Sequence, residues 1–143
     1  MVSERVPLTI LNNLIHDEEY TRKVIPFIEE DYFEERSDKI VFEEITTFLK
    51  AYDSLPSKEV LHIEVGKRTD LTQDEFQSTE QLINALGEAE YEQEWVYDTT
   101  EAWCKERAIY NALMESIKIA DGQDEKKNRD AIPSILSLSL IHI

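Results

Sequence analysis

The stretch from Tyr91 to Ala120 constrains the fold most, because its thirty residues include neither glycine nor proline. Apolar side chains recur along it in two rows of period seven, with two more residues on a third edge: Val96, Trp103, Tyr110 and Ile117; Trp95, Ala102 and Ile109; Leu113 and Ala120. Such rows predict one long helix with a broad apolar face.

The length of this predicted helix suggests what its apolar face is for. Thirty helical residues are about 45 Å long, whereas a compact domain of this chain's size has a radius of gyration of only about 14–15 Å. The helix must therefore cross the whole body or project from it. A projecting apolar face needs a partner, which is either a return helix or another subunit.

The remainder of the chain also favours helices. Its 143 residues include only 3 glycines and 4 prolines, and no sustained period-2 alternation indicates strands. We expect an all-α protein with a small globular helical head over residues 1–89. A helical hairpin over residues 90–137 follows, consisting of the long helix, a charged loop and a truncated return leg.

Local signals place five short helices in the head. The predicted helices begin at Leu8 behind Pro7, near Tyr20, after Ser37, after Ser57 and after Thr72. We interpret Ser37 and Ser57 as N-caps, and Thr72 with Glu75 as a capping box. The inner face of the third helix is predicted to carry Ile40, Val41, Ile45, Phe48, Leu49 and Tyr52, and Gly87 is expected just past the end of the fifth helix.

Charge and composition exclude several classes of function. The net charge of −16 repels phosphate backbones, so the chain is a poor candidate for gripping DNA or RNA by itself. A single cysteine, Cys104, excludes an internal disulfide and a cysteine zinc site. No signal peptide and no apolar run near roughly eighteen residues is present, so we expect a soluble intracellular protein without a membrane span.

Catalytic and metal motifs receive little support. Gly66, Gly87 and Gly122 do not form a phosphate-binding loop, so we expect no ATP site in this chain. Glu59 and His62 have the Glu-x-x-His spacing of di-iron bundles, but the second motif that such a site requires is absent. Cys104 is interpreted as a packing residue rather than a reactive thiol. We therefore predict no catalytic, cofactor-binding or metal-binding residue.

The last six residues, Leu138 to Ile143, have a separate interpretation. They match, residue for residue, a translation of a transposon-end adapter used in shotgun sequencing libraries. We therefore expect the natural sequence to depart from this one after Ser137 and the reading frame to be truncated. The competing interpretation is an ordinary apolar helix end, and His142 is left out of functional reasoning in either case.

An ordered series of short landmarks runs through nearly the whole chain up to Ser137. It comprises Leu14-Ile15-His16-Asp17, Tyr20, Lys23-Val24, Pro26, Tyr32-Phe33-Glu34, Lys39, Phe42, Ile45, Pro56-Ser57, Leu71-Thr72, Glu75-Phe76, Trp95-Val96, Thr100-Glu101, Trp103, Arg107-Ala108, Asn111-Ala112 and Ala131-Ile132-Pro133. The series resembles the N-terminal domain of the T-even-phage type of replicative DNA helicase, a branch of the DnaB family.

The resemblance implies a role in assembly. In that family such domains pair through their hairpins, and three pairs form a collar above a hexameric ATPase ring whose motor binds ATP and magnesium. This chain lacks the motor, so we expect no enzymatic activity and DNA contact only through the full-length parent. The implied partners are other copies of the chain and, as a further role, a primase or helicase loader in the cytoplasm of the infected bacterium.

The interaction residues that follow from this interpretation lie on the long helix. The hairpin and its pairing surface are expected to be lined by Trp95, Val96, Trp103, Tyr110, Leu113 and Ile117, with Arg107 and Glu101 as rim or capping contacts. The alternative is a free-standing all-α adaptor or regulatory protein. An enzyme with a carboxylate or metal site is the least favoured interpretation.

Overall fold

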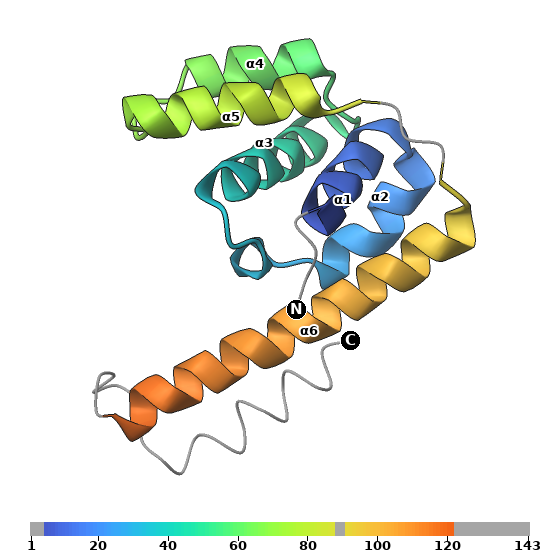
Figure 1. Ribbon diagram of the computed structural model, residues 1–143. Coiled ribbons are helices and arrows are strands. Elements are labelled where there is room, and N and C mark those ends of the chain that lie inside the picture. Colours follow the sequence, from blue (N-terminus) through green and yellow to red (C-terminus); the bar gives the residue numbers. More distant parts are fainter. Residues whose placement is uncertain (1–4, 88–90, 122–143) are drawn as a thin grey trace.

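The computed structural model describes residues 5–87 and 91–121, and within these ranges every regular element is helical (Figure 1). This confirms the all-α prediction. The elements, in chain order, are α1 Arg5–His16, α2 Glu18–Val24, the 3-10 turns η1 Ile25–Phe27 and η2 Glu30–Tyr32, α3 Arg36–Tyr52, α4 Lys58–Gly66, α5 Gln73–Ala85 and α6 Gln93–Ala120. The predictions for the loop, the return leg and residues 138–143 lie outside the described residues.

Two of the predicted N-caps are present. The Ser57 hydroxyl accepts a hydrogen bond from the Val60 amide at the start of α4. At the start of α5 the Thr72 hydroxyl accepts from the Glu75 amide at 3.1 Å, and the Glu75 carboxylate accepts from the Thr72 amide at 2.9 Å. Each cap satisfies amides that the first turn of a helix leaves without a partner.

The third helix departs from its prediction at both ends. Ser37 is not its N-cap, because α3 already begins at Arg36 and the preceding Glu35 occupies the cap position without a side-chain hydrogen bond. Tyr52, predicted to face inward, is 69% exposed and stacks on Phe48 instead. Tyr52 is the last residue of α3 and lies beyond the helices that cover the middle of α3. The next residue, Asp53, ends the helix in the left-handed conformation, with φ 52°.

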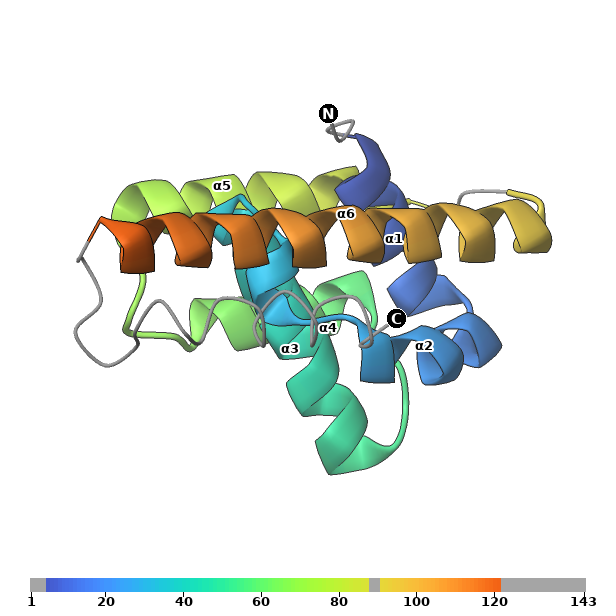
Figure 2. The same ribbon diagram turned by 90° about the horizontal axis from the view of Figure 1, so that it is seen from below.

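The core of the head lies between α1, α3 and the two 3-10 turns. Its fully buried side chains include Leu11, Leu14, Ile40, Ile45 and Phe33. Helices α4 and α5 pack side by side on α3, and α2 lies next to α1 (Figures 1 and 2). One polar contact holds the end of the α5 segment on α1, because the Gly87 amide donates to the Asn12 side chain at 3.2 Å.

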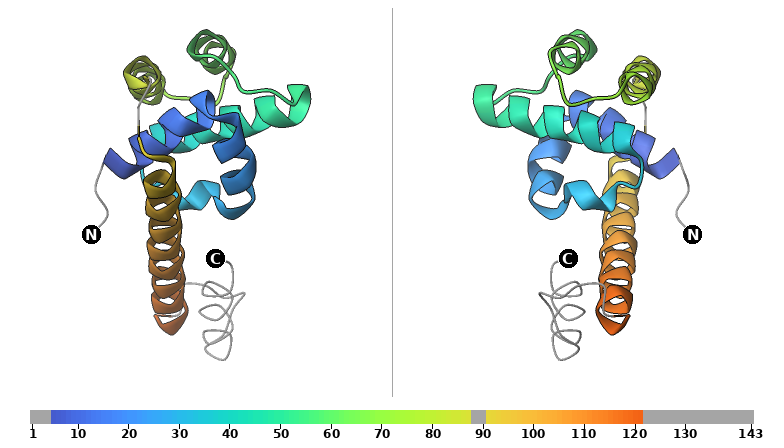
Figure 3. Two further views of the ribbon diagram at one scale, coloured as in Figure 1. Left: turned by 90° about the vertical axis from the view of Figure 1, so that its right-hand side faces the viewer. Right: turned by 90° about the vertical axis from the view of Figure 1, so that its left-hand side faces the viewer.

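The long helix is one continuous element. α6 runs for 28 residues and ends at Ala120, as predicted. Its first half packs against α1, α2 and η2, and its second half extends away from the head (Figures 1 and 3). A single helix therefore both closes the head and projects from it.

Candidate protein-interaction surface

Two of the predicted interaction residues fasten α6 to the head of the same chain. Val96 is 4% exposed and Trp103 is 3% exposed. The Trp103 ring packs edge-on against Tyr32 and tilted against Phe33, with ring centroids 6.1 and 4.9 Å apart. These side chains are covered within the chain, so in this structure they are not available to a partner.

Arg107 also belongs to the head side of α6, which corrects its expected position at a rim. Its side chain is buried, its Nε donates to the Tyr32 carbonyl at 2.6 Å, and its Nη1 donates to the Glu34 carboxylate at 2.8 Å. The Tyr110 ring covers the guanidinium at 4.7 Å from its centroid. The Tyr32 carbonyl is buried away from water, and Arg107 supplies the hydrogen-bond donor that it requires.

A buried polar contact that no sequence pattern indicates joins α2 to α6. The Tyr20 hydroxyl lies 2.7 Å from the Thr100 hydroxyl, which itself donates to the Val96 carbonyl. Because the single Thr100 hydrogen is used there, Tyr20 is the donor to Thr100. Burial raises the pKa of the Tyr20 hydroxyl, so it stays protonated and keeps this role. The two residues are separated by 80 positions, and no local pattern indicates the pair.

The other four predicted residues are exposed on α6. Trp95, Tyr110 and Leu113 are each 48% exposed, and Ile117 is 51% exposed. Ile109 and Met114, at 38% and 39%, lie among them. We call Ile109, Tyr110, Leu113, Met114 and Ile117 the exposed stripe. Trp95 is on the same side of the helix, because its separation from Leu113 amounts to about five turns at 3.6 residues per turn.

The predicted heptad row from Val96 to Ile117 is therefore divided along the helix into a covered part and an exposed part. A strict seven-residue repeat drifts by about 20° per heptad around a straight helix. This drift is small, so all four side chains of the row point in similar directions. Val96 and Trp103 meet the head, whereas Tyr110 and Ile117 are exposed because their half of α6 extends beyond the head. Ala108, a small side chain of this half, still packs against the core of the head.

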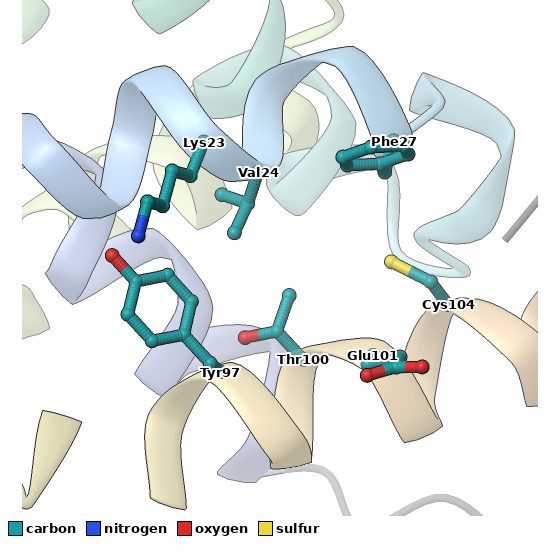
Figure 4. Close-up of a pocket in the computed structure, with 7 residues that line it drawn as sticks. All are labelled: Lys23, Val24, Phe27, Tyr97, Thr100, Glu101 and Cys104. Atoms are coloured by element: carbon teal, nitrogen blue, oxygen red, sulfur yellow. The ribbon is translucent and has the colours of Figure 1, made fainter. Parts of the chain in front are cut away.

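A pocket of about 380 Å³ lies where α6 passes α2 and η1 (Figure 4). Lys23, Val24 and Phe27 form one wall, and Tyr97, Thr100, Glu101 and Cys104 form the other. The Lys23 ammonium lies 5.2 Å from the centre of the Tyr97 ring. Burial raises the pKa of the Cys104 thiol to about 12, which keeps it protonated and makes it a packing group, as predicted, rather than a nucleophile.

His62, the histidine of the Glu-x-x-His pattern, contacts two side chains of α5. The His62 ring contacts the Glu80 carboxylate, and its second nitrogen lies 3.1 Å from the Asn84 side-chain oxygen; both partners are on α5. The histidine thus links α4 to α5. Among residues 5–87 and 91–121, no three His, Cys, Asp or Glu side chains are grouped to hold a metal ion.

Comparison with known proteins identifies a relative of this chain. No protein-family model matches the chain. The DnaB-like replicative helicase of Enterobacteria phage T4 is 31% identical over 139 aligned residues, which cover 92% of this chain and 29% of that protein. This chain is a relative of the DnaB-like replicative helicase. The resemblance inferred from the ordered landmarks is thereby confirmed.

The relationship covers the head and the long helix together, but only a part of the relative. The chain spans less than a third of the T4 helicase, so the activity and partners of the whole protein do not follow from the match. Within the described part of the chain, no helix is long and apolar enough to cross a membrane. The two-unit division at residues 89 and 90 and the pairing role of the seven interaction residues stay predictions.

Proposed function

We propose that this chain is the N-terminal collar domain of a phage replicative DNA helicase, and that the exposed stripe of α6 pairs two copies of it. The DnaB-like relationship of the chain supports the helicase context. In the proposed parent, a separate motor carries out ATP-dependent unwinding with magnesium. The part played by this chain is assembly, and docking of a primase or a loader is a further predicted role.

The exposed stripe is the observation that carries this proposal. Five apolar side chains, each more than a third exposed, follow one another on the half of α6 that leaves the head. Contiguous exposed apolar surface on a protein of otherwise high charge marks an interaction site. Burying such side chains contributes several kcal/mol at about 25 cal/mol per Å², from which the entropy of association is subtracted.

The geometry favours a symmetric pair. The half of α6 that carries the exposed stripe extends away from the head, and we expect two such helices to lie along each other there. A two-fold arrangement uses the same stripe on both copies. The two helices would then bury Leu113 and Ile117 of one copy against the equivalent residues of the other. In this proposal residues 1–89 form the head and residues 90–137 form the pairing hairpin.

The test is to place charge in the exposed stripe. Leu113→Glu and Ile117→Glu should each weaken self-association, measured by sedimentation equilibrium, by about tenfold or more, because a carboxylate would have to be buried in the pair. Ile63→Glu on α4 is the matched control, since Ile63 and Ile117 have the same exposed fraction of 51%. Thermal melting of each variant excludes unfolding as the cause.

The result that contradicts the proposal is equally direct. If Ile117→Glu and Ile63→Glu have the same association constant as the unsubstituted chain, the stripe does not pair copies. A chain that stays monomeric at all concentrations would favour the alternative of a free-standing adaptor.

A further inference from the structure

A second cavity, of about 370 Å³, lies on the side of α6 that holds Arg107, where α1, α3 and α5 also meet. Its apolar lining includes Leu8, Leu82 and Trp103, and its polar lining includes Glu34, Glu35 and Asp38. We call it the acidic cleft. Its residues differ from those of the exposed stripe, so the inference below does not depend on the proposed pairing.

The described lining of the acidic cleft has more acidic than basic side chains. Arg107 is the cationic residue that lines it, and its guanidinium is already bound to the Tyr32 carbonyl and the Glu34 carboxylate. Within the described residues, the carboxylates of Glu35 and Asp38 form no ion pair with a lysine or arginine. Two negative groups therefore border an apolar surface without a counter-charge.

The environment of Asp38 supports the same conclusion. Burial, together with the neighbouring charge of Glu35, raises the pKa of the Asp38 carboxyl to about 6. A carboxylate in such a place is stabilised when a cation approaches within about 4–6 Å. A lysine or arginine side chain entering the cleft would supply that cation.

We propose that the acidic cleft binds a basic amphipathic segment of a partner protein. An apolar side chain of the segment packs against Leu8 and Leu82, which are only partly buried, and a lysine or arginine pairs with Glu35 and Asp38. Nucleic acid is disfavoured because its phosphates would meet carboxylates.

The site is tested with a short designed helix of leucine and lysine, and with the same peptide carrying glutamate in place of lysine. Binding to the full chain is measured by calorimetry, and the contact surface is mapped by NMR at the methyl groups of Leu8 and Leu82. We expect the lysine peptide to bind, to shift these signals, and to bind more weakly as salt is added. The glutamate peptide should not bind.

Two pairs of variants locate the binding. Ala85→Arg places a cation and extra bulk on the exposed wall of the cleft, and Gln81→Arg makes the same charge change one turn away on α5, outside the lining. Glu35→Gln with Asp38→Asn removes two charges from the start of α3, one at the N-cap and one in the first turn. Glu59→Gln with Asp74→Asn removes two charges from the first turns of α4 and α5. The cleft variants should weaken peptide binding by roughly tenfold or more, and the controls should leave it within about twofold.

Three results would overturn the proposal. The first is equal binding by Ala85→Arg and Gln81→Arg. The second is a set of shifted signals confined to the exposed stripe, which would mean that the peptide binds there. The third is loss of self-association in Ala85→Arg, measured by sedimentation, which would make a second copy of the chain the occupant. Variants are compared only if their melting temperatures match that of the unsubstituted chain.

Discussion

The two tryptophans of α6 have opposite environments on one helix. Trp103 is 3% exposed and packs on Tyr32 and Phe33, whereas Trp95 is 48% exposed and stacks on Tyr91. Sequence periodicity treats both as members of apolar heptad rows. The head covers the first part of one row, which includes Trp103, and leaves the row of Trp95 exposed.

Truncation of each ring should therefore have a different effect. We expect Trp103→Ala to lower the free energy of unfolding by roughly 3–5 kcal/mol, because it removes a large buried side chain and leaves a cavity. Trp95→Ala should change it by less than about 1 kcal/mol. Chemical denaturation of both variants measures the difference, and equal losses would show that the buried position of Trp103 is wrong.

At the scale of the element, helix starts follow short-range rules closely. Thr72 and Glu75 form a reciprocal cap at the beginning of α5, and Ser57 caps α4. Each cap requires only residues three apart in the chain, so the sequence pattern is sufficient. The sequence pattern predicts Ser37 as the N-cap of α3 and is wrong there, because Glu35, whose side chain forms no capping hydrogen bond, occupies that position.

The capping box gives an element-scale prediction. Thr72→Ala removes the hydroxyl that accepts from the Glu75 amide and should lower stability by about 1 kcal/mol. Thr72→Ser keeps the hydroxyl and should recover most of that loss. Melting curves of the two variants decide the point, and an alanine variant as stable as the parent would mean that the cap does not stabilise α5.

At the scale of the whole molecule, acidic residues outnumber basic ones, which gives the net charge of −16. Some of their carboxyl groups lie close to each other. A hydrogen bond with Glu43, together with burial, raises the pKa of Glu30 from 4.5 to about 7. Burial also acts on Glu43, but its hydrogen bonds with Glu30 and Arg68 lower its pKa overall. The two carboxyls, on η2 and α3, therefore share one proton near neutral pH.

This pair predicts a pH dependence of stability. A raised pKa in the folded state means that the folded chain binds the proton more tightly than the unfolded chain. The contribution of Glu30 is therefore fully present below about pH 4.5 and is lost as the pH rises to about 7. Glu30→Gln mimics the protonated form, so its stability relative to the parent should increase over that range.

Denaturation of the parent and of Glu30→Gln at a series of pH values measures this effect. Glu59→Gln, which removes one exposed carboxylate from α4, is the control and should run parallel to the parent. A constant difference between the parent and Glu30→Gln from pH 4.5 to 7 would contradict the shared proton.

Local sequence determined the helical class, two of the caps, and the uninterrupted helix that ends at Ala120. These features depend on hydrogen bonds and side-chain periodicity over three to seven neighbouring residues, which are visible in one sequence. The ordered landmarks added the relationship to a replicative helicase, although each landmark is short.

Only the tertiary structure decided which side of the long helix is covered. The Tyr20–Thr100 hydrogen bond, the bonds from Arg107 to Tyr32 and Glu34, and the acidic cleft each join residues far apart in the chain. Periodicity indicates that a helix has an apolar side, but burial depends on where another element ends. Because the head stops near the middle of α6, one row of similar side chains becomes core at Trp103 and exposed surface at Ile117.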